Sequence, residues 1–387
     1  MSGVVLYECL TEFSSGHHLE KAELWLKEAA RIYDHVILVT YGSPSFIVPL
    51  NTEIVSISQL PSWCFKRNAQ KFTGIRQAFL NYKGWRAALR ISKHRGLPAL
   101  SLTTLVPGNL LASYLAGKQK GVGHLVMAIP GSKQRHSISA IIYRFLIRNI
   151  AQKGISFFCN TEKISLSLRN ITAPYTDSIH WTFDPVELPS ATGSKAKSNH
   201  RLKILIPGDD RAGRTAIANV AQSWKNLRHY EFLVHVPGAS SARLAEIRAT
   251  FSPTNKDDHI IIKNEYLTRD QLYELYGSVD TVLLDYAPGL EMGSGNILLA
   301  LAHQKPVIST PFVAYLDMKK QVGNIGESFA SDTPDSLPTA ISRLLAWSEN
   351  DWHNFYSNCE KAKALFSACS VAAYAFGKLQ INFTDKS

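Results

Sequence analysis

Short apolar runs alternate with longer segments of helical periodicity along most of the chain. Val4–Tyr7 is an apolar run typical of a buried strand, and a polar, Gly-containing turn separates it from a predicted helix at Leu19–Tyr33. This alternation favours βα units around a parallel sheet. The first half has further predicted strands at His35–Tyr41, Thr52–Ile57, Leu100–Leu105, His124–Ile129 and Ile155–Cys159, and a predicted helix at Ile138–Ile150.

The stretch Pro185–Arg201 is rich in Pro, Ser and Lys and has no periodicity, which is the composition of a linker. A second α/β series follows it. Because 387 residues suit two domains better than one, we predict an α/β protein with two Rossmann-like, doubly wound domains at residues 1–185 and 200–364. The strands of the second series are predicted at Leu202–Ile206, Glu231–Val236, His259–Ile262, Thr281–Leu284 and Pro306–Ser309.

Positive charge is concentrated in the first half of the chain. The formal net charge is +11, and residues 54–161 contain sixteen Lys or Arg but no Asp or Glu. Within this part, Trp63–Arg95 interleaves cations with aromatic residues, as in amphipathic elements that bind anionic lipid head groups. A solvated charged face is the alternative. Nucleic acid, the usual partner of a basic strip, is disfavoured because no recognition motif accompanies the charge.

The cysteines and the apolar segments bear on the compartment. The five cysteines are scattered and odd in number, without a CxxC pair, which favours a reducing compartment over a disulfide framework or a zinc site. The N-terminal residues lack the features of a signal peptide, and no window approaches the length of an apolar spanning helix. We therefore expect a cytoplasmic protein that is peripheral on the inner face of the membrane.

The segment Leu202–Arg214 is the first candidate for chemistry. A predicted strand ends in Pro207-Gly208, and a short loop then presents Arg211 and Arg214 before a helix. A glycine permits close backbone approach, and two guanidinium groups three residues apart can converge on one phosphate. A solvated loop, in which these arginines pair with the neighbouring aspartates, is the alternative.

The segment Thr281–Thr310 is the second candidate. A predicted strand leads to an acidic, glycine-rich turn, Glu291 to Gly295, which an apolar helix and another strand follow. A Gly-Ser-Gly turn that opens a helix exposes backbone N–H groups at the positive end of the helix dipole. The alternative is a cap that only satisfies its own helix. Both segments lie where a strand's carboxyl end meets a helix, which is where open α/β sheets bind ligands.

The order of these features, from Leu202 to about Leu345, resembles the donor domain of the retaining group-1 (family 4) glycosyltransferases. In that family a strand ends in Gly and is followed by Arg-x-x-Lys. The residues Gly208 through Arg214 are similar to this motif, with Arg214 in the Lys position. The family's middle segment is similar to Glu265 through Asp280. The family's hallmark is an acidic residue, then a Gly-rich turn, a helix and a Lys-Pro-Val-Ile strand. The residues Glu291 through Ile308 are similar to this series.

The resemblance implies a GT-B fold, with two domains facing across a cleft and a C-terminal helix, about 365–387, packing back on the first domain. It also implies roles for individual residues. Arg211 and Arg214 would neutralise the donor diphosphate, and Glu291 would contact the transferred sugar. The remaining donor contacts would come from Gly208, from Tyr266 and Leu267 at the base, and from Gly293, Ser294 and Gly295.

Two positions depart from the family pattern. The family has a second Glu eight residues after the first, usually at the ribose, and Leu299 stands there in this chain. Gln304 stands where the family has a Gly before Lys-Pro-Val-Ile.

No metal is expected, because the Asp pairs of the second half do not have the spacing of a hard-cation cage.

The first half offers fewer candidates. In GT-B enzymes the turn after the first strand lies over the cleft, and in this chain it contains Gly16, His17 and His18. Gly16 would let the backbone approach ligand, and His17 or its neighbour would act as base or sugar contact. The family's later N-domain His is absent from its place, so it is either missing from this chain or displaced to His136 or His124. Ordinary surface histidines are the alternative at each of these positions.

The sequence therefore predicts a metal-independent glycosyltransferase that moves a sugar from a UDP- or GDP-sugar to a membrane-associated glycolipid or polysaccharide acceptor. The family favours retention of configuration. No separate cofactor is expected, since the nucleotide-sugar is a substrate, and no nucleic acid is expected as a partner. A degenerate GT-B protein that binds a nucleotide-sugar or a partner transferase without turnover is one alternative. A sugar-nucleotide epimerase of the same fold is another.

Overall fold

The structure is a computed structural model of the whole chain, which folds into two compact units. Unit 1 comprises Met1–Glu187 and Phe366–Ser387, and unit 2 comprises Leu188–Leu365. The predicted α/β class with two doubly wound parallel sheets is confirmed. The structure describes residues 2–9, 17–58, 73–119, 121–127, 129, 138–182, 187, 201–208, 216–251, 259–286, 294–333 and 335–384.

Unit 1 is built on a seven-stranded parallel sheet of order β3-β2-β1-β4-β5-β6-β7. Its strands are β1 (Gly3–Tyr7), β2 (His35–Thr40), β3 (Thr52–Ser56), β4 (Ala99–Ser101), β5 (Val122–Val126), β6 (Ser156–Cys159) and β7 (Ile179–Trp181). Its helices are α1 (His17–Ile32), α2 (Thr73–Arg95), α3 (Pro107–Ala116), α4 (Ile138–Gln152), α5 (Glu162–Thr172) and α14 (Ala368–Thr384).

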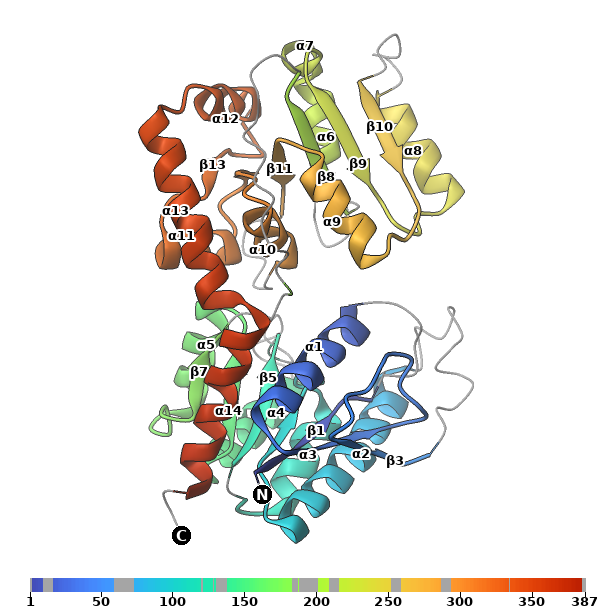
Figure 1. The fold of residues 1–387 in the computed structure, drawn as a ribbon, viewed down its shortest axis with the longest axis vertical. Helices are drawn as coiled ribbons and strands as arrows, with labels where there is room; N and C mark the ends of the chain where they lie inside the picture. Colours follow the sequence, from blue (N-terminus) through green and yellow to red (C-terminus); the bar gives the residue numbers. More distant parts are fainter. Residues whose placement is uncertain are drawn as a thin grey trace. The chain divides into compact units, whose positions relative to one another are not determined.

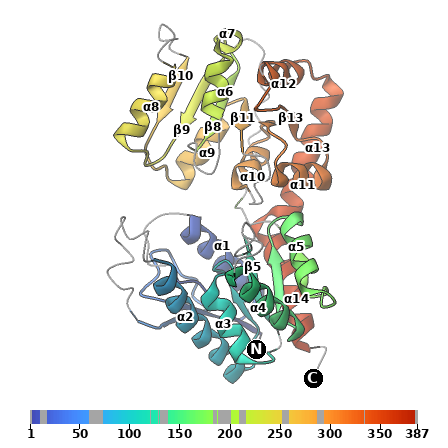
Figure 2. The ribbon, with the colours of Figure 1, turned by 180° about the vertical axis from the view of Figure 1, so that it is seen from behind.

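The central strands of unit 1 are apolar without interruption because helices cover both faces of the sheet. Val5 and Tyr7 point to the face that α2, α3, α4 and α5 cover (Figure 2). Val4 and Leu6 point to the opposite face, which α1 and α14 cover (Figure 1). Alternate residues of one strand therefore contribute to two separate cores.

The C-terminal helix α14 is an integral part of the second of these cores. The Phe376 ring on α14 meets Trp25 and Tyr33 edge to face, with centroid distances of 5.6 and 5.4 Å. All three side chains are buried. The chain thus returns to unit 1 after completing unit 2, and residues far apart in sequence share one core.

Unit 2 is built on a six-stranded parallel sheet of order β10-β9-β8-β11-β12-β13. Its strands are β8 (Lys203–Pro207), β9 (Glu231–His235), β10 (Ile260–Lys263), β11 (Thr281–Leu284), β12 (Val307–Ser309) and β13 (Gly326–Ser328). Its helices are α6 (Ala216–Gln222), α7 (Trp224–Leu227), α8 (Ser241–Phe251), α9 (Arg269–Gly277), α10 (Gly295–Ala302), α11 (Val313–Val322), α12 (Ser336–Leu345) and α13 (Glu349–Phe366).

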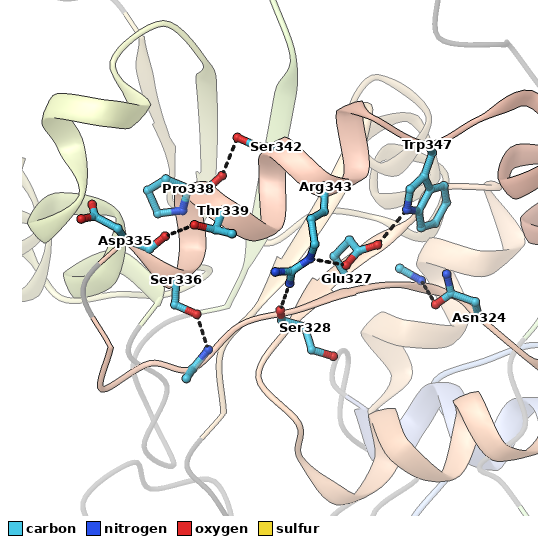
Figure 3. A network of polar contacts seen from close by, with 12 residues as sticks. Asn324, Glu327, Ser328, Asp335, Ser336, Pro338, Thr339, Ser342, Arg343 and Trp347 are labelled. Carbon is cyan, nitrogen blue, oxygen red and sulfur yellow. Dashed lines mark hydrogen bonds and ion pairs between the residues drawn. The ribbon is translucent and has the colours of Figure 1, made fainter.

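Glu327 on the edge strand β13 anchors helix α12 and the segment after it. Its carboxylate accepts hydrogen bonds from Arg343 Nε at 2.9 Å and from Trp347 Nε1 at 2.8 Å (Figure 3). Arg343 also donates to the Ser328 carbonyl at 2.6 Å. The Glu327 side chain is mostly buried, and its bond to Trp347 is partly shielded from water, whereas Arg343 is half exposed.

Replacing Glu327 by Ala is therefore expected to lower the free energy of unfolding of unit 2 by about 2 kcal/mol, because two donors lose a charged acceptor. Urea denaturation followed by tryptophan fluorescence measures the loss. Glu246→Ala is the matched control, since Glu246 forms an exposed ion pair with Arg243 at 2.8 Å and exposed pairs contribute only about 0.2–1 kcal/mol. Equal losses in the two variants would contradict the anchoring role.

Candidate functional site

The candidate site of unit 2 lies at the switch point of its sheet. β8 and β11 are neighbours, and the chain runs outward from β8 to β9 and β10, but from β11 to β12 and β13 in the opposite direction. Crossover helices leave on different faces on the two sides of such a point, which opens a crevice at the carboxyl ends of the two strands. Both segments singled out in the sequence follow these two strands.

Gly208 directly follows β8 and adopts a conformation that favours glycine. Its φ is +93°, a backbone region that L side chains rarely adopt. Its N–H donates to the His235 carbonyl at 2.7 Å, which fixes the turn to the end of β9. The predicted phosphate ligands Arg211 and Arg214 follow within residues 209–215, which lie outside the described residues.

Helix α10 begins at the switch point, and no described residue fills the space beside its first residue. Ser294 is its N-cap residue but makes no side-chain capping bond, and its Oγ instead lies 3.2 Å from the Tyr286 hydroxyl. A Cβ built on Gly295 would meet no atom within 4 Å among the described residues. The first N–H groups of a helix have no partner within the helix and carry its positive dipole end. This helix start can therefore receive an anion.

Hydrogen bonds from neighbouring elements hold the start of α10 in place. Thr310, just after β12, donates its hydroxyl to the Tyr286 carbonyl and accepts the Tyr286 N–H, each at 3.0 Å. The Tyr276 hydroxyl on α9 donates to Asn296 Oδ1 at 2.9 Å. These contacts connect the end of β11 and α9 to α10. Glu291 and Gly293 fall within residues 287–293, outside the described residues.

A buried polar pair at the same point was not predicted from the sequence. Asp285, the residue after β11, is buried and accepts a hydrogen bond from the Asn219 side chain on α6. The bond connects the helix that follows the Arg211 segment to the strand that precedes the Glu291 turn. Asp285 and Asn219 therefore join the two described elements that flank these segments. Only their chain positions, directly after a strand and within a helix, could have drawn attention to them.

The predicted base-binding segment follows β10. Tyr266 is 67% exposed, and its ring lies over Gly238, in the space that a side chain at that position would fill. Leu267 is half-buried beside it. His235 Nε2 lies 3.1 Å from the Glu265 carbonyl, and burial lowers the pKa of His235, so its neutral ring donates this bond. A capping box of Thr268 and Gln271 then starts α9 and fixes the end of the segment.

The candidates of the first half are placed less fully. His17 is the first residue of α1, whereas Gly16 and His136 lie outside the described residues. His124, the alternative to His136, is a core residue. It is fully buried on β5, and its Nε2 lies 2.9 Å from the Ser113 hydroxyl. Interpreting His124 as a sugar contact was wrong, because its ring points into the core beneath α2 and α3.

Glu8 is a second buried carboxylate that sequence reasoning missed. It directly follows β1, at the switch point between β1 and β4 of the first sheet. One of its oxygens accepts the Cys9 N–H at 2.9 Å and the Thr103 hydroxyl at 3.1 Å. Glu8 thereby connects the ends of the two strands at the carboxyl edge of unit 1. Glu8 lies outside residues 54–161, the stretch that contains no Asp or Glu.

Comparison with known proteins identifies the fold. No family model and no curated protein matches the sequence. The structure is similar to a glycosyltransferase from Rickettsia africae ESF-5, with a TM-score of 0.66, 12% identity and coverage of 100% of this chain and 99% of that one. It is also similar to Anabaena Alr3699/HepE in complex with UDP and glucose, with a TM-score of 0.67, 11% identity and coverage of 98% and 100%.

A third similar structure is the sucrose-phosphate synthase of Thermosynechococcus elongatus, with a TM-score of 0.66, 14% identity and full coverage of both chains. All three comparisons span essentially the whole chain. At this level of identity they establish the fold, which is the two-sheet GT-B fold predicted from the sequence. Among the described residues, no helix has both the length and the apolar character needed to cross a membrane.

Proposed function

We propose that the chain is a glycosyltransferase that takes its sugar from a UDP-sugar. The observation that carries the proposal is the start of α10, which is uncapped by its own serine, open at Gly295 and located at the switch point of unit 2. Structures of the same fold include one with UDP and glucose bound and one with UDP-glucose bound. UDP is accordingly the nucleotide to test first, and GDP is the alternative.

The proposed chemistry assigns one role to each segment of the site. The backbone N–H groups at Ser294 and Gly295 hold the diphosphate, and Arg211 and Arg214 neutralise the charge that develops on the leaving group. Tyr266 and Leu267 border the base. Glu291 contacts the transferred sugar and stabilises its oxocarbenium-like transition state. No metal is required, because the arginines and the helix dipole supply the positive charge.

The proposed acceptor is a membrane-borne, lipid-linked saccharide, bound by unit 1, and the proposed outcome is retention. The acceptor is supported by the basic, acid-free stretch of the first half. Retention is supported by the resemblance to the group-1 enzymes, together with the scarcity of carboxylates that could act as a base in unit 1. His17 and His136 are proposed as contacts to the sugar or the acceptor.

UDP is expected to raise the melting temperature of the wild-type protein. A ligand that binds only the folded state stabilises it by about 2.7 kcal/mol at 100 times Kd. For a unit of this size the stabilisation corresponds to roughly 5–10 °C. Scanning fluorimetry with UDP, GDP, ADP and dTDP measures the shift and identifies the base.

The variants Arg211→Ala and Arg214→Ala are expected to lose this shift. Arg248→Ala is the matched control, because Arg248 is an exposed arginine on α8 of the same unit, and it should respond as the wild type does. If no nucleotide stabilises the wild type, the donor site is wrong. If UDP binds but UDP-sugars are neither hydrolysed nor transferred, the chain is the degenerate binding protein instead.

A further inference from the structure

Helices α2, α3 and α4 form one outer face of unit 1. They lie side by side over the same side of the sheet and share its core (Figure 2). Gly108 on α3 lies against the backbone of α2 at Ala78 and Tyr82, so that no side chain separates these two helices there. The Tyr114 ring on α3 meets Phe145 on α4 at a centroid distance of 6.0 Å. The outward sides of the three helices therefore form a continuous surface.

This surface carries large apolar side chains in contact with water. On α3, Leu111 and Leu115 are spaced four residues apart and project from the same side of the helix. The exposed apolar residues of the surface are 42–60% accessible, and they are Phe79, Leu111, Leu115, Ile141, Ile142 and Phe145. Contiguous apolar patches of this kind mark interaction sites on soluble proteins. We call these six residues the apolar patch.

Cations surround the apolar patch. Lys83, Arg86 and Arg90 follow Phe79 on the exposed side of α2 at helical spacing, and Arg144 and Arg148 are exposed on α4 beside Phe145. Two of these cations lie over aromatic rings, with Lys83 Nζ 4.6 Å from the Phe79 centroid and the Arg86 guanidinium 5.7 Å from that of Tyr82. No acidic residue occurs on any of the three helices, since residues 54–161 contain none.

We infer that the outer face of α2, α3 and α4 docks on an anionic lipid bilayer. A bilayer offers phosphates to the cations and, just beneath them, an apolar layer for the patch. Two of the alternatives fit less well. A nucleic acid would leave six exposed apolar side chains unused, and a second copy of this face would bring like charges together. The cation–π contacts hold the basic groups close to the apolar groups, so that both can enter the head-group layer at one place.

The inference deepens the membrane-borne acceptor of the proposed function, and it extends the basic stretch of α2 to two further helices. Only the reason for lipid binding, which is access to a membrane-borne acceptor, rests on the proposed function. The surface itself is independent of the donor site, because its residues all belong to unit 1, whereas the UDP contacts belong to unit 2. Binding to lipid and binding to UDP can therefore be tested separately on the same protein.

The test is cosedimentation of the full chain with vesicles of phosphatidylcholine, with and without about one third phosphatidylglycerol. Wild type is expected to bind the anionic vesicles and to dissociate as salt rises from about 0.1 to 0.5 M. The triple variant Lys83→Gln, Arg86→Gln, Arg90→Gln is expected to bind about 100-fold more weakly, at about fivefold per cation near the surface. The triple variant Leu115→Ser, Ile141→Ser, Phe145→Ser should lose at least about tenfold.

Matched controls come from unit 2. The triple variant Ile261→Ser, Leu316→Ser, Leu345→Ser removes exposed apolar residues there, 40–54% accessible. The triple variant Lys225→Gln, Arg228→Gln, Arg248→Gln removes exposed cations. Both controls should bind vesicles as wild type does, and all four variants should keep the UDP shift. Equal binding by wild type and either test variant would overturn the inference. So would a change of oligomeric state confined to the test variants, which would show that a second copy covers the face.

Discussion

Gly295→Ala is expected to weaken UDP binding by at least tenfold while leaving the melting temperature of the free protein unchanged or slightly raised. Every Cα–Cβ bond in a helix tilts toward the N-terminus. A methyl group on the first residue of α10 therefore projects into the open space where the diphosphate is proposed to lie. A steric conflict of about 1.4–2.8 kcal/mol, within the usual range for a forced overlap, corresponds to about a 10- to 100-fold loss of affinity. Calorimetric titration with UDP measures it.

The substitution Gly295→Ala is not expected to destabilise the folded protein. No described atom lies within 4 Å of the new methyl group, and alanine favours a helix over glycine. Gly377→Ala on α14 is the matched control, since its methyl group also meets open space but in unit 1. It should leave UDP binding unchanged. If Gly295→Ala bound UDP as tightly as the wild type, the diphosphate would not lie at this helix start.

The sequence predicts most strands of both sheets because a parallel strand buried on two faces is a continuous apolar run. The prediction at Thr281–Leu284 coincides with β11, and the one at Glu231–Val236 exceeds β9 by a single residue. The helix prediction Ile138–Ile150 likewise begins where α4 begins. These segments needed no tertiary information, because burial alone determines their composition.

Two of the edge strands and one strand end were predicted poorly for a related reason. β7 (Ile179–Trp181) and β13 (Gly326–Ser328) were not predicted, since each is three residues long, lies at an edge and includes polar residues or glycine. The prediction Leu100–Leu105 extends past β4, which ends at Ser101. Leu102 and Leu105 are buried by tertiary contacts beyond the strand, so their apolar character does not indicate a strand.

The candidate site was predictable where one short segment carries the signal and not where two distant segments meet. Gly208 and Gly295 could be singled out as glycines at a strand end and at a helix start. The pairing of Asp285 with Asn219 joins residues 66 positions apart, and neither has a local pattern. The apolar patch shows the same limit, because α2 alone displays a basic helix and its apolar neighbours come from α3 and α4. The roles of Arg211, Arg214 and Glu291 stay predictions.

Unit 1 is expected to lose stability steeply between pH 6.5 and pH 4, and His124 is the main cause. Its ring is fully buried between Trp85 and Phe157, at centroid distances of 5.2 and 6.0 Å. Its Nδ1 has no hydrogen-bond partner within the described structure. Burial lowers the pKa of His124 from 6.5 to about 3. Burial and two nearby cations, Lys378 and Arg169, lower the pKa of His180 to about 4.

The sign of the effect follows from proton binding. Below pH 6.5 the unfolded chain protonates both histidines, whereas the folded chain keeps them neutral until about pH 4 or below. The unfolded state thus binds more protons, and the free energy of unfolding falls as the pH falls. For His124 alone the loss is about 2 kcal/mol at pH 5. Urea denaturation at a series of pH values measures the slope.

The variant His124→Gln distinguishes the titration of His124 from the titration of the carboxyl groups and of the other histidines. The glutamine cannot titrate, and its side chain can still meet the Ser113 hydroxyl, which in turn accepts the Trp85 Nε1–H at 2.7 Å. The variant is expected to be less stable at neutral pH, because it packs less well, but to lose about one proton from the slope between pH 6.5 and 4. His353→Gln, at an exposed position on α13, should keep the wild-type slope. Equal slopes of unfolding free energy against pH for His124→Gln and wild type would contradict this prediction. They would mean that the buried ring takes up its proton without unfolding unit 1, which requires water to enter the core around β5.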